Sequence, residues 1–276
     1  MATLPSYPGM STYFGNCHCG AFKFRLVAGS ELKEAAVCDC SICSKKGHRL
    51  HSVGGNDGFI VTKGDVQTDK TLTTYTFGNK KWRHRFCKVC GTPLLIQGPL
   101  LMASLRAIQN VDLDALPLNT DHKGSELEPI YRPPTPPAVD CPPGSTRYTG
   151  GCHCGAITYT LIQPDSEKLT TLSDCNCSIC SRNGPLHAYI ATKNLTVHGA
   201  ETGVTEYSFG SKQGVHTFCK TCGVAVYTRF AGPEDGYLSP ARRALNARTL
   251  NGVDLAEFEV TKANGKGYPP EYVVPE

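Results

Sequence analysis

Residues 38–43 read CDCSIC, and residues 175–180 read CNCSIC. Three cysteines within six residues are an unusual feature, and this chain of 276 residues contains it twice. The flanking sequence repeats in the same order, as GNCHCGAFKF (15–24) with GGCHCGAITY (150–159) and YTFGNKKWRHRFCKVCG (75–91) with YSFGSKQGVHTFCKTCG (207–223). We therefore predict two tandem copies of one cysteine-rich domain.

The predicted domains cover residues 11–130 and 148–276, and residues 131–147 form a linker between them. Six prolines in this linker exclude a helix or a central strand, so we expect a stiff and extended segment. Cys141 lies in the linker and has no counterpart in the repeat. We expect it to be a free thiol without a special role.

The composition predicts a mainly β protein. Glycine (28 residues) and proline (19 residues) are frequent, and the apolar runs are short, which favours short antiparallel strands joined by turns. Four segments read as strands: AFKFRLV (21–27), FIVTKG (59–64), AITYTLI (156–162) and LTVHG (195–199). Only ELKEAAV (31–37) and the segment around ARRALNA (241–247) are expected to be briefly helical.

The fifteen cysteines are interpreted as metal ligands. The chain has no apolar run of 18 residues and no signal sequence at its start, so we expect a cytoplasmic protein in which thiols stay reduced. The formal net charge of +4 counts thiols as neutral. If fourteen thiolates bind four zinc ions, fourteen negative charges meet eight positive ones and the net charge becomes −2. The basic balance is therefore no evidence for nucleic-acid binding.

Each copy has seven cysteines, which we divide into four and three. A structural zinc takes four protein ligands, whereas a catalytic zinc takes three and keeps one position open. On a strand, C-x-C places both sulfurs on one face, and C-x-x-C-G forms the turn of zinc ribbons. The two predicted structural sites are Cys17, Cys19, Cys87, Cys90 and Cys152, Cys154, Cys219, Cys222; the two predicted open sites are Cys38, Cys40, Cys43 and Cys175, Cys177, Cys180.

Two alternatives stay open at this point. Cys40 and Cys43 could join the C-x-x-C pair at 87–90 in an ordinary zinc ribbon. Alternatively, a three-cysteine group could be structural, with a fourth ligand from His48, His51 or His187.

The motifs resemble a known family. GNCHCG, CDCSICSK and FCKVCG in the first copy, and GGCHCG, CNCSICSR and FCKTCG in the second, are similar to the motifs of the glutathione-dependent formaldehyde-activating enzymes, a family that includes centromere protein V. The resemblance implies a zinc-binding β-tent fold in each domain. It also implies that the C-x-C and C-x-x-C cysteines are structural and that the three-cysteine groups lie at the active centre. The activity of the family joins formaldehyde to glutathione.

The two copies depart differently from the family pattern. Arg182 in the second copy replaces the family-like Lys45 of the first. The second copy keeps the N-x-R stretch in LNARTLNGVDL (245–255), while the first has LRAIQNVDL (105–113). We therefore expect the first copy to have lost part of its substrate pocket.

The expected function is that of a zinc-dependent carbon–sulfur lyase acting on a thiol such as glutathione and an aldehyde. Three thiolates leave an open zinc site with a net charge of −1, which favours delivery of a bound thiolate over activation of a carbonyl. The carboxylates of glutathione call for cationic partners, and the residues expected to bind it are Lys80, His84, Lys212 and His216. The alternative function is a non-catalytic zinc module that binds a protein or nucleic acid, although neither nucleic acid nor a membrane is the expected partner.

Other positions at which the two copies have the same residue have simpler expected roles. His18 and His153 stand between the cysteines of C-x-C, so on a strand their side chains would face away from the metal. Tyr75, Tyr207 and the phenylalanines at 77 and 209 alternate as strand residues do, which predicts packing in the core.

Overall fold

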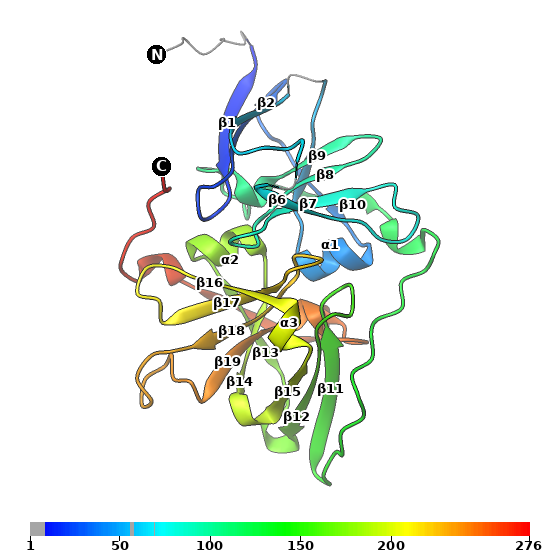
Figure 1. The fold of residues 1–276 in the computed structure, drawn as a ribbon, viewed down its shortest axis with the longest axis vertical. Coiled ribbons are helices and arrows are strands. Elements are labelled where there is room, and N and C mark those ends of the chain that lie inside the picture. Colours follow the sequence, from blue (N-terminus) through cyan, green and yellow to red (C-terminus); the bar gives the residue numbers. More distant parts are fainter. Residues whose placement is uncertain (1–8, 56–57, 69) are drawn as a thin grey trace.

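The computed structural model describes residues 9–55, 58–68 and 70–276. Two similar β units follow each other along the chain, and each contains a three-stranded and a seven-stranded sheet (Figure 1). The prediction of a mainly β protein with two tandem β-tent domains is thereby confirmed. We call the two units the first and the second half, because the domain boundaries at 130 and 148 stay a prediction.

The strands of the first half form two sheets. In spatial order, the small sheet contains β1 (Ser11–Asn16), β2 (Lys23–Ala28) and β5 (Phe59–Lys63). The large sheet contains β10 (Leu118–His122), β3 (Ala35–Cys38), β4 (Leu50–Ser52), β9 (Leu101–Ser104), β8 (Pro93–Gln97), β7 (Arg83–Cys87) and β6 (Leu72–Tyr75).

The second half repeats this arrangement. Its small sheet contains β11 (Ser145–Gly151), β12 (Thr158–Pro164) and β15 (Leu195–His198). Its large sheet contains β16 (Val204–Ser208), β17 (Gly214–Cys219), β18 (Ala225–Phe230), β19 (Arg242–Asn246), β14 (His187–Ala191), β13 (Thr171–Cys175) and β20 (Glu259–Ala263). The expectation of antiparallel strands fails at one pair in each half, since β10 pairs with β3 and β20 with β13 in parallel.

The helices are short. The α-helices are α1 (Ser41–Lys46), α2 (Ser178–Asn183) and α3 (Ala200–Gly203). The 3₁₀ turns are η1 (Leu105–Ala107), η2 (Gly124–Glu126), η3 (Asp165–Glu167), η4 (Thr192–Asn194), η5 (Ala247–Thr249), η6 (Leu255–Glu257) and η7 (Gly265–Gly267). Within the described part of the chain, none of these helices has the length and apolar character needed to span a bilayer.

The predicted helical segments were wrong. ELKEAAV ends in strand β3, and ARRALNA contains strand β19, because sheet pairing with distant partners overrides the local preference of alanine and leucine. Helices α1 and α2 instead lie inside the three-cysteine motifs. Each ends at a glycine with positive φ, Gly47 (54°) or Gly184 (66°), as is typical of a helix C-cap.

The core continues from one half into the other. Ile42 and Phe86 of the first half belong to the same buried cluster as Leu186 and Phe218 of the second. The rings of Phe86 and Phe218 meet edge to face at 6.3 Å. Helices α1 and α2 lie between the two halves (Figure 1), so both three-cysteine motifs lie close to this boundary.

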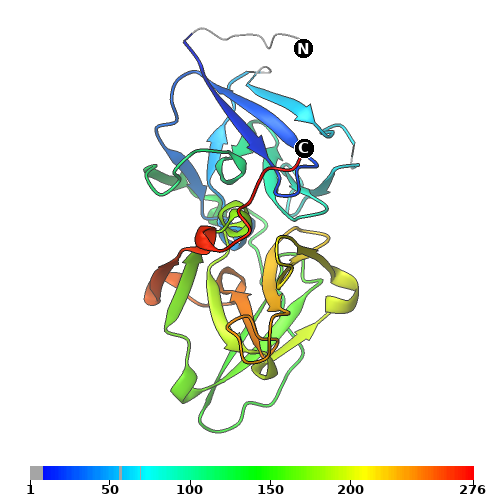
Figure 2. The same cartoon turned by 90° about the vertical axis from the view of Figure 1, so that its left-hand side faces the viewer.

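Two extended segments bind the halves together from outside. Residues 130–142 contain no helix or strand and run along the second half (Figure 1), whereas residues 145–147 of the predicted linker already belong to strand β11. The C-terminal tail leaves the second half and reaches the first (Figure 2), where the Tyr272 hydroxyl donates a hydrogen bond of 2.6 Å to the His18 carbonyl.

Candidate metal centres

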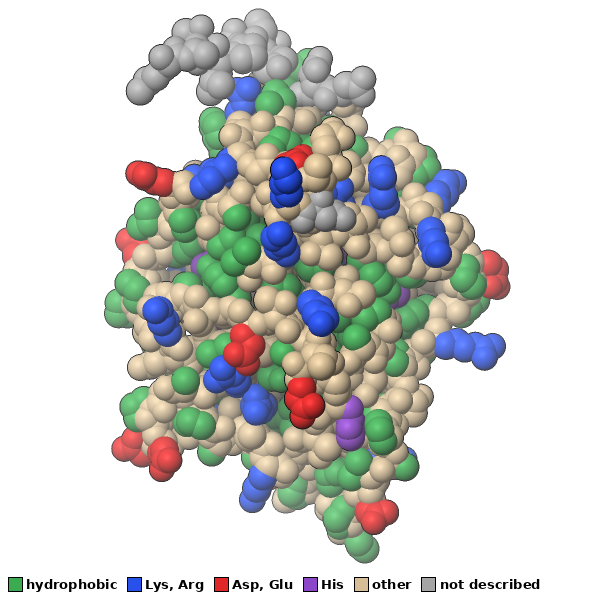
Figure 3. Space-filling view, viewed as in Figure 1, with side chains coloured by type: hydrophobic (Ala, Val, Ile, Leu, Met, Phe, Trp, Pro, Cys, Tyr) green, Lys and Arg blue, Asp and Glu red, His purple; other side chains and the backbone are tan. Residues whose placement is uncertain are grey.

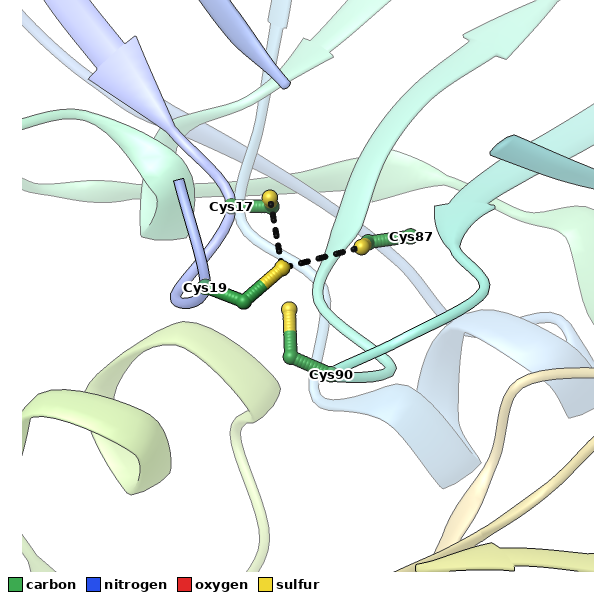
Figure 4. A group of neighbouring side chains, drawn as sticks. All are labelled: Cys17, Cys19, Cys87 and Cys90. Carbon is green, nitrogen blue, oxygen red and sulfur yellow. Dashed lines mark hydrogen bonds between the residues drawn. The ribbon is translucent and has the colours of Figure 1, made fainter. Parts of the chain in front are cut away.

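Four cysteines converge in each half. In the first half, Cys17 and Cys19 follow β1, Cys87 ends β7, and Cys90 lies in the next turn, with their sulfurs pointing toward one another (Figure 4). The Sγ atoms of Cys17 and Cys19, and those of Cys19 and Cys87, are 3.6 Å apart. The second half brings together Cys152, Cys154, Cys219 and Cys222 in the same way, with the Cys152–Cys154 and Cys154–Cys219 sulfurs 3.6 Å apart.

These donor sets fit a tetrahedral zinc ion. With Zn–S bonds of about 2.3 Å, the sulfurs at the corners of a tetrahedron are separated by roughly 3.8 Å. The C-x-C pairs achieve this from a turn that follows the strand, and not from the strand itself as expected. Gly91 and Gly223 adopt φ of +75° and +69° after C-x-x-C, which permits the tight return of the backbone.

Three cysteines converge in each of the other groups. Cys38 ends β3, Cys40 precedes α1 and Cys43 lies within it, and the second half repeats this placement with Cys175, Cys177 and Cys180. The three sulfurs of each group lie within 4.8 Å of one another. Among the described residues, no histidine joins either group, so His48, His51 and His187 are not brought into it as a fourth ligand.

The thiols of each three-cysteine group hold their protons unequally. Hydrogen bonds from the Cys40 and Cys43 thiols lower the pKa of Cys38 to about 2, and the same interaction with Cys38 raises the pKa of Cys40 to about 11. Cys177 and Cys180 likewise lower the pKa of Cys175 to about 2. The neighbouring thiols thus favour a thiolate at Cys38 and at Cys175, and a divalent cation would allow all three thiols of a group to ionise.

Two glycines that we did not single out in the sequence lie against the three-cysteine groups. A Cβ atom on Gly124 would be 2.7 Å from Cys38 Sγ, and one on Gly265 would be 2.6 Å from Cys175 Sγ. Both glycines begin the 3₁₀ turns that follow the parallel strands β10 and β20. The parallel pairing thus brings a residue without a side chain against the sulfurs.

A small cavity adjoins the three-cysteine group of the second half. It measures about 20 Å³, and its lining includes Cys180, Asn183, His187, His216 and Asn246. Asn183 Oδ1 and His187 Nδ1 are buried and have no hydrogen-bond partner within the described residues. Burial lowers the pKa of His216 to about 3, so this imidazole is neutral. The cavity thus presents uncharged polar groups beside a sulfur cluster.

Comparison with known proteins decides the family. Residues 12–123 and 147–241, most of the chain, match the family described as glutathione-dependent formaldehyde-activating enzyme. The chain belongs to this family. A Halomonas elongata protein named after the same activity is 26% identical over 144 residues, which are 45% of this chain and 90% of that protein. A crystal structure of a Rhodobacter sphaeroides protein is 29% identical, with a TM-score of 0.33, and covers 41% of this chain and 99% of that one.

The two copies of the formaldehyde-activating-enzyme domain differ at the cavity. The register of the β7–β8 and β17–β18 pairs makes His84 the counterpart of His216 and Ile96 the counterpart of Thr228. By the same alignment, the first half has Lys46, Leu50 and Ser104 at the positions of Asn183, His187 and Asn246. The Lys46 ammonium lies 4.6 Å from the centre of the Phe86 ring. Two polar residues of the cavity, His187 and Thr228, are therefore replaced by apolar Leu50 and Ile96 in the first copy.

The four residues expected to bind glutathione differ in exposure and charge. Lys80 and Lys212 are exposed in the turns between β6 and β7 and between β16 and β17, with φ of 57° and 59°. His84 is buried, His216 is partly buried, and burial lowers the pKa of each to about 3. The histidines can therefore offer hydrogen bonds to a substrate, while the lysines alone offer positive charge.

The histidines of the two C-x-C motifs are buried and face the opposite half. His18 contacts the side chains of Tyr207 and Ser178, and His153 contacts those of Tyr75 and Ser41. Both imidazoles direct their ring nitrogens at residues of the opposite half and not at a cysteine, and both side chains are buried. The hydroxyls of Tyr75 and Tyr207 thus have polar partners in addition to the expected core packing.

Proposed function

We propose that the chain is a zinc-dependent enzyme of the carbon–sulfur lyase type that joins a thiol such as glutathione to formaldehyde or a related small carbonyl compound. We further propose that the second half holds the working site. The observation that carries this proposal is the cavity beside Cys180. Its volume of about 20 Å³ has room for roughly one water-sized group, which suits a very small aldehyde.

Cys175, Cys177 and Cys180 would hold the zinc ion. Zinc bound by three thiolates keeps one position open and supplies stabilisation of a substrate thiolate or polarisation of a carbonyl. Cysteines that serve as zinc ligands are typical of a reducing compartment, which supports a cytoplasmic location.

The reaction needs no leaving group. The sulfur of the thiolate bonds to the carbonyl carbon, the C=O electron pair moves to the oxygen, and this oxygen takes up the proton lost by the thiol. Because burial lowers the pKa of His216 to about 3, its imidazole would relay that proton without becoming charged, accepting at one nitrogen while it donates from the other. Asn183 Oδ1 has no partner among the residues that the structure describes and would accept a hydrogen bond from the new hydroxyl.

We retain Lys212 as the residue that contacts a carboxylate of the thiol substrate, and Lys80 as its counterpart. Positive φ favours glycine or asparagine, so the turn itself does not explain a lysine there. Its presence at both hairpin turns supports a role for the charged side chain.

The first half fits the alternative function, a non-catalytic zinc module. Its three cysteines converge as in the second half, but Leu50 and Ile96 replace polar residues of the cavity. We therefore propose that this half supports the second one. On the face drawn in Figure 3, Lys and Arg appear mostly as separate side chains within uncharged surface, which favours small-molecule substrates over nucleic acid.

One pair of variants tests the proposal. The rate of adduct formation between glutathione and formaldehyde, followed by exchange NMR, is expected to fall to the uncatalysed rate in Cys177→Ala. The matched variant Cys40→Ala in the first half should retain most of the rate. Circular dichroism should show that both proteins are folded. Unchanged turnover in Cys177→Ala would exclude the second half as the working site.

A further inference from the structure

Each C-x-C loop reaches across the boundary to the three-cysteine motif of the opposite half. His18 lies between Cys17 and Cys19, and its Nε2 is 2.9 Å from the Oγ of Ser178 in the second half. In the second copy, His153 Nε2 is 2.8 Å from the Oγ of Ser41. Ser178 and Ser41 are the first residues of α2 and α1, directly after a cysteine of the open group. The same crossing therefore occurs twice, once in each direction.

The His18 imidazole is held at both nitrogens and on its faces. Its Nδ1 is 2.8 Å from the Tyr207 hydroxyl. The rings of Phe209 and Tyr272 lie at 4.2 Å and 4.3 Å from its centre. His18 is only 1% exposed. The ring thus has one orientation, which fixes the position of the hydroxyl that it contacts.

The counterpart His153 is held by equivalent residues. Its Nδ1 is 2.8 Å from the Tyr75 hydroxyl, and the rings of Phe77 and Tyr131 lie at 4.5 Å and 4.3 Å. The Tyr131 hydroxyl donates to the His153 carbonyl at 3.0 Å, as Tyr272 does to that of His18. The linker and the C-terminal tail therefore have the same role at the two loops.

Helix α2 depends on this contact for its placement. It has six residues, and its N-cap residue Cys177 makes no side-chain capping hydrogen bond. A helix of this length is not stable by itself in water. Its far end is also fixed to the first half, because Arg182 donates from Nε to the Asn16 carbonyl at 3.3 Å. Both ends of α2 are thus attached to residues 16–18 of the other half.

We propose that His18 is a positioning residue for the three-cysteine site of the second half, and that His153 has this role for the first. The contact sets where Cys177 and Cys180 lie relative to Cys175, which is on strand β13 and not on the helix. The inference rests on the proposed function for its link to turnover. Its core statement, that each open metal site is oriented by the opposite half, stands on geometry alone.

Two substitutions of His18 separate the contact from the rest of the ring. His18→Gln places a polar atom near the position of Nε2 and can keep the hydrogen bond to Ser178. His18→Asn reaches only to the position of Nδ1 and loses that bond. The readout is site-resolved alkylation of the zinc-loaded full-length protein, in which mass spectrometry follows each cysteine peptide. His153→Asn is the matched control for the other direction.

In His18→Asn we expect alkylation of Cys175, Cys177 and Cys180 to be about tenfold faster, since loss of a residue that supports metal ligands typically costs about 10- to 100-fold in metal affinity. The peptide with residues 38–43 should react at the wild-type rate, and His18→Gln should stay near wild type. His153→Asn should reverse the pattern. The rate of the glutathione–formaldehyde reaction should fall at least tenfold in His18→Asn only.

The proposal is overturned if His18→Asn leaves the 175–180 peptide unchanged, affects both three-cysteine peptides equally, or exposes its own Cys17 and Cys19 first. If His18→Asn does not fold, Ser178→Ala removes the same hydrogen bond from the other side, and unchanged alkylation would overturn the proposal there. If alkylation changes as expected but turnover does not, the positioning role stands and the proposed function fails.

Discussion

Replacement of Gly265 by alanine tests how the second-half site is enclosed. The added Cβ would lie 2.6 Å from both Cys175 Sγ and Cys177 Cβ, whereas ordinary contact begins at 3.4 Å, so the groups must separate by 0.8 Å. A misplacement of about 1 Å at reacting groups can cost about 100-fold in rate, so we expect a loss of this order in Gly265→Ala. Overpacking of this kind also costs about 1–3 kcal/mol of stability.

Gly124→Ala is the matched control in the first half. Its Cβ would lie 2.7 Å from Cys38 Sγ and 2.6 Å from Cys40 Cβ, so the steric strain is the same. Neither glycine is among the described residues with positive φ, and alanine therefore adds no backbone strain. We expect equal losses in thermal stability by calorimetry but a loss of turnover in Gly265→Ala alone. Equal losses of turnover would refute the assignment of the working site, and an unaffected Gly265→Ala would refute the steric argument.

Three further predictions concern metal and stability. Cys222→Ala should unfold the second half, as measured by circular dichroism. A structural zinc contributes about 10–16 kcal/mol of folding free energy, and the net stability of a domain is only about 5–15 kcal/mol. A native melting curve would contradict this. A chromophoric chelator should remove about two of four zinc ions quickly, since three-ligand sites are open; a single slow phase would speak against open sites. Lys45→Met removes hydrogen bonds of 3.2 Å to the carbonyls of Gly151 and Thr249 across the boundary. We expect the free energy of unfolding, measured in urea, to fall by about 2 kcal/mol, and an unchanged midpoint would contradict this.

The sequence predicts what depends on spacing along the chain. The tandem repeat, the strands near residues 23, 59, 158 and 195, and the division of cysteines into four and three follow from short motifs that each copy contains in full. The four-cysteine groups in particular need only two local pairs and a sheet that brings them together.

The remaining features depend on contacts between distant segments. Helices α1 and α2 are too short to show a helical period, and the parallel partners β10 and β20 lie far along the chain from β3 and β13. The strand argument for C-x-C gave no reason to expect that His18 would contact Ser178, which is 160 residues away. The replacement of Thr228 by Ile96 at the cavity position becomes apparent only when the strand register aligns the two residues.

The crosswise contacts give the chain an internal pseudo-twofold relation with a particular consequence. In a homodimer, any substitution appears on both sides of the axis, so neither active site can change alone. Here the two sides are encoded by separate codons. Tyr131 and Tyr272, which pack against the histidines of the two loops, can therefore be substituted independently. Fusion thus permits one copy to specialise in catalysis while its twin is selected only for holding it in place.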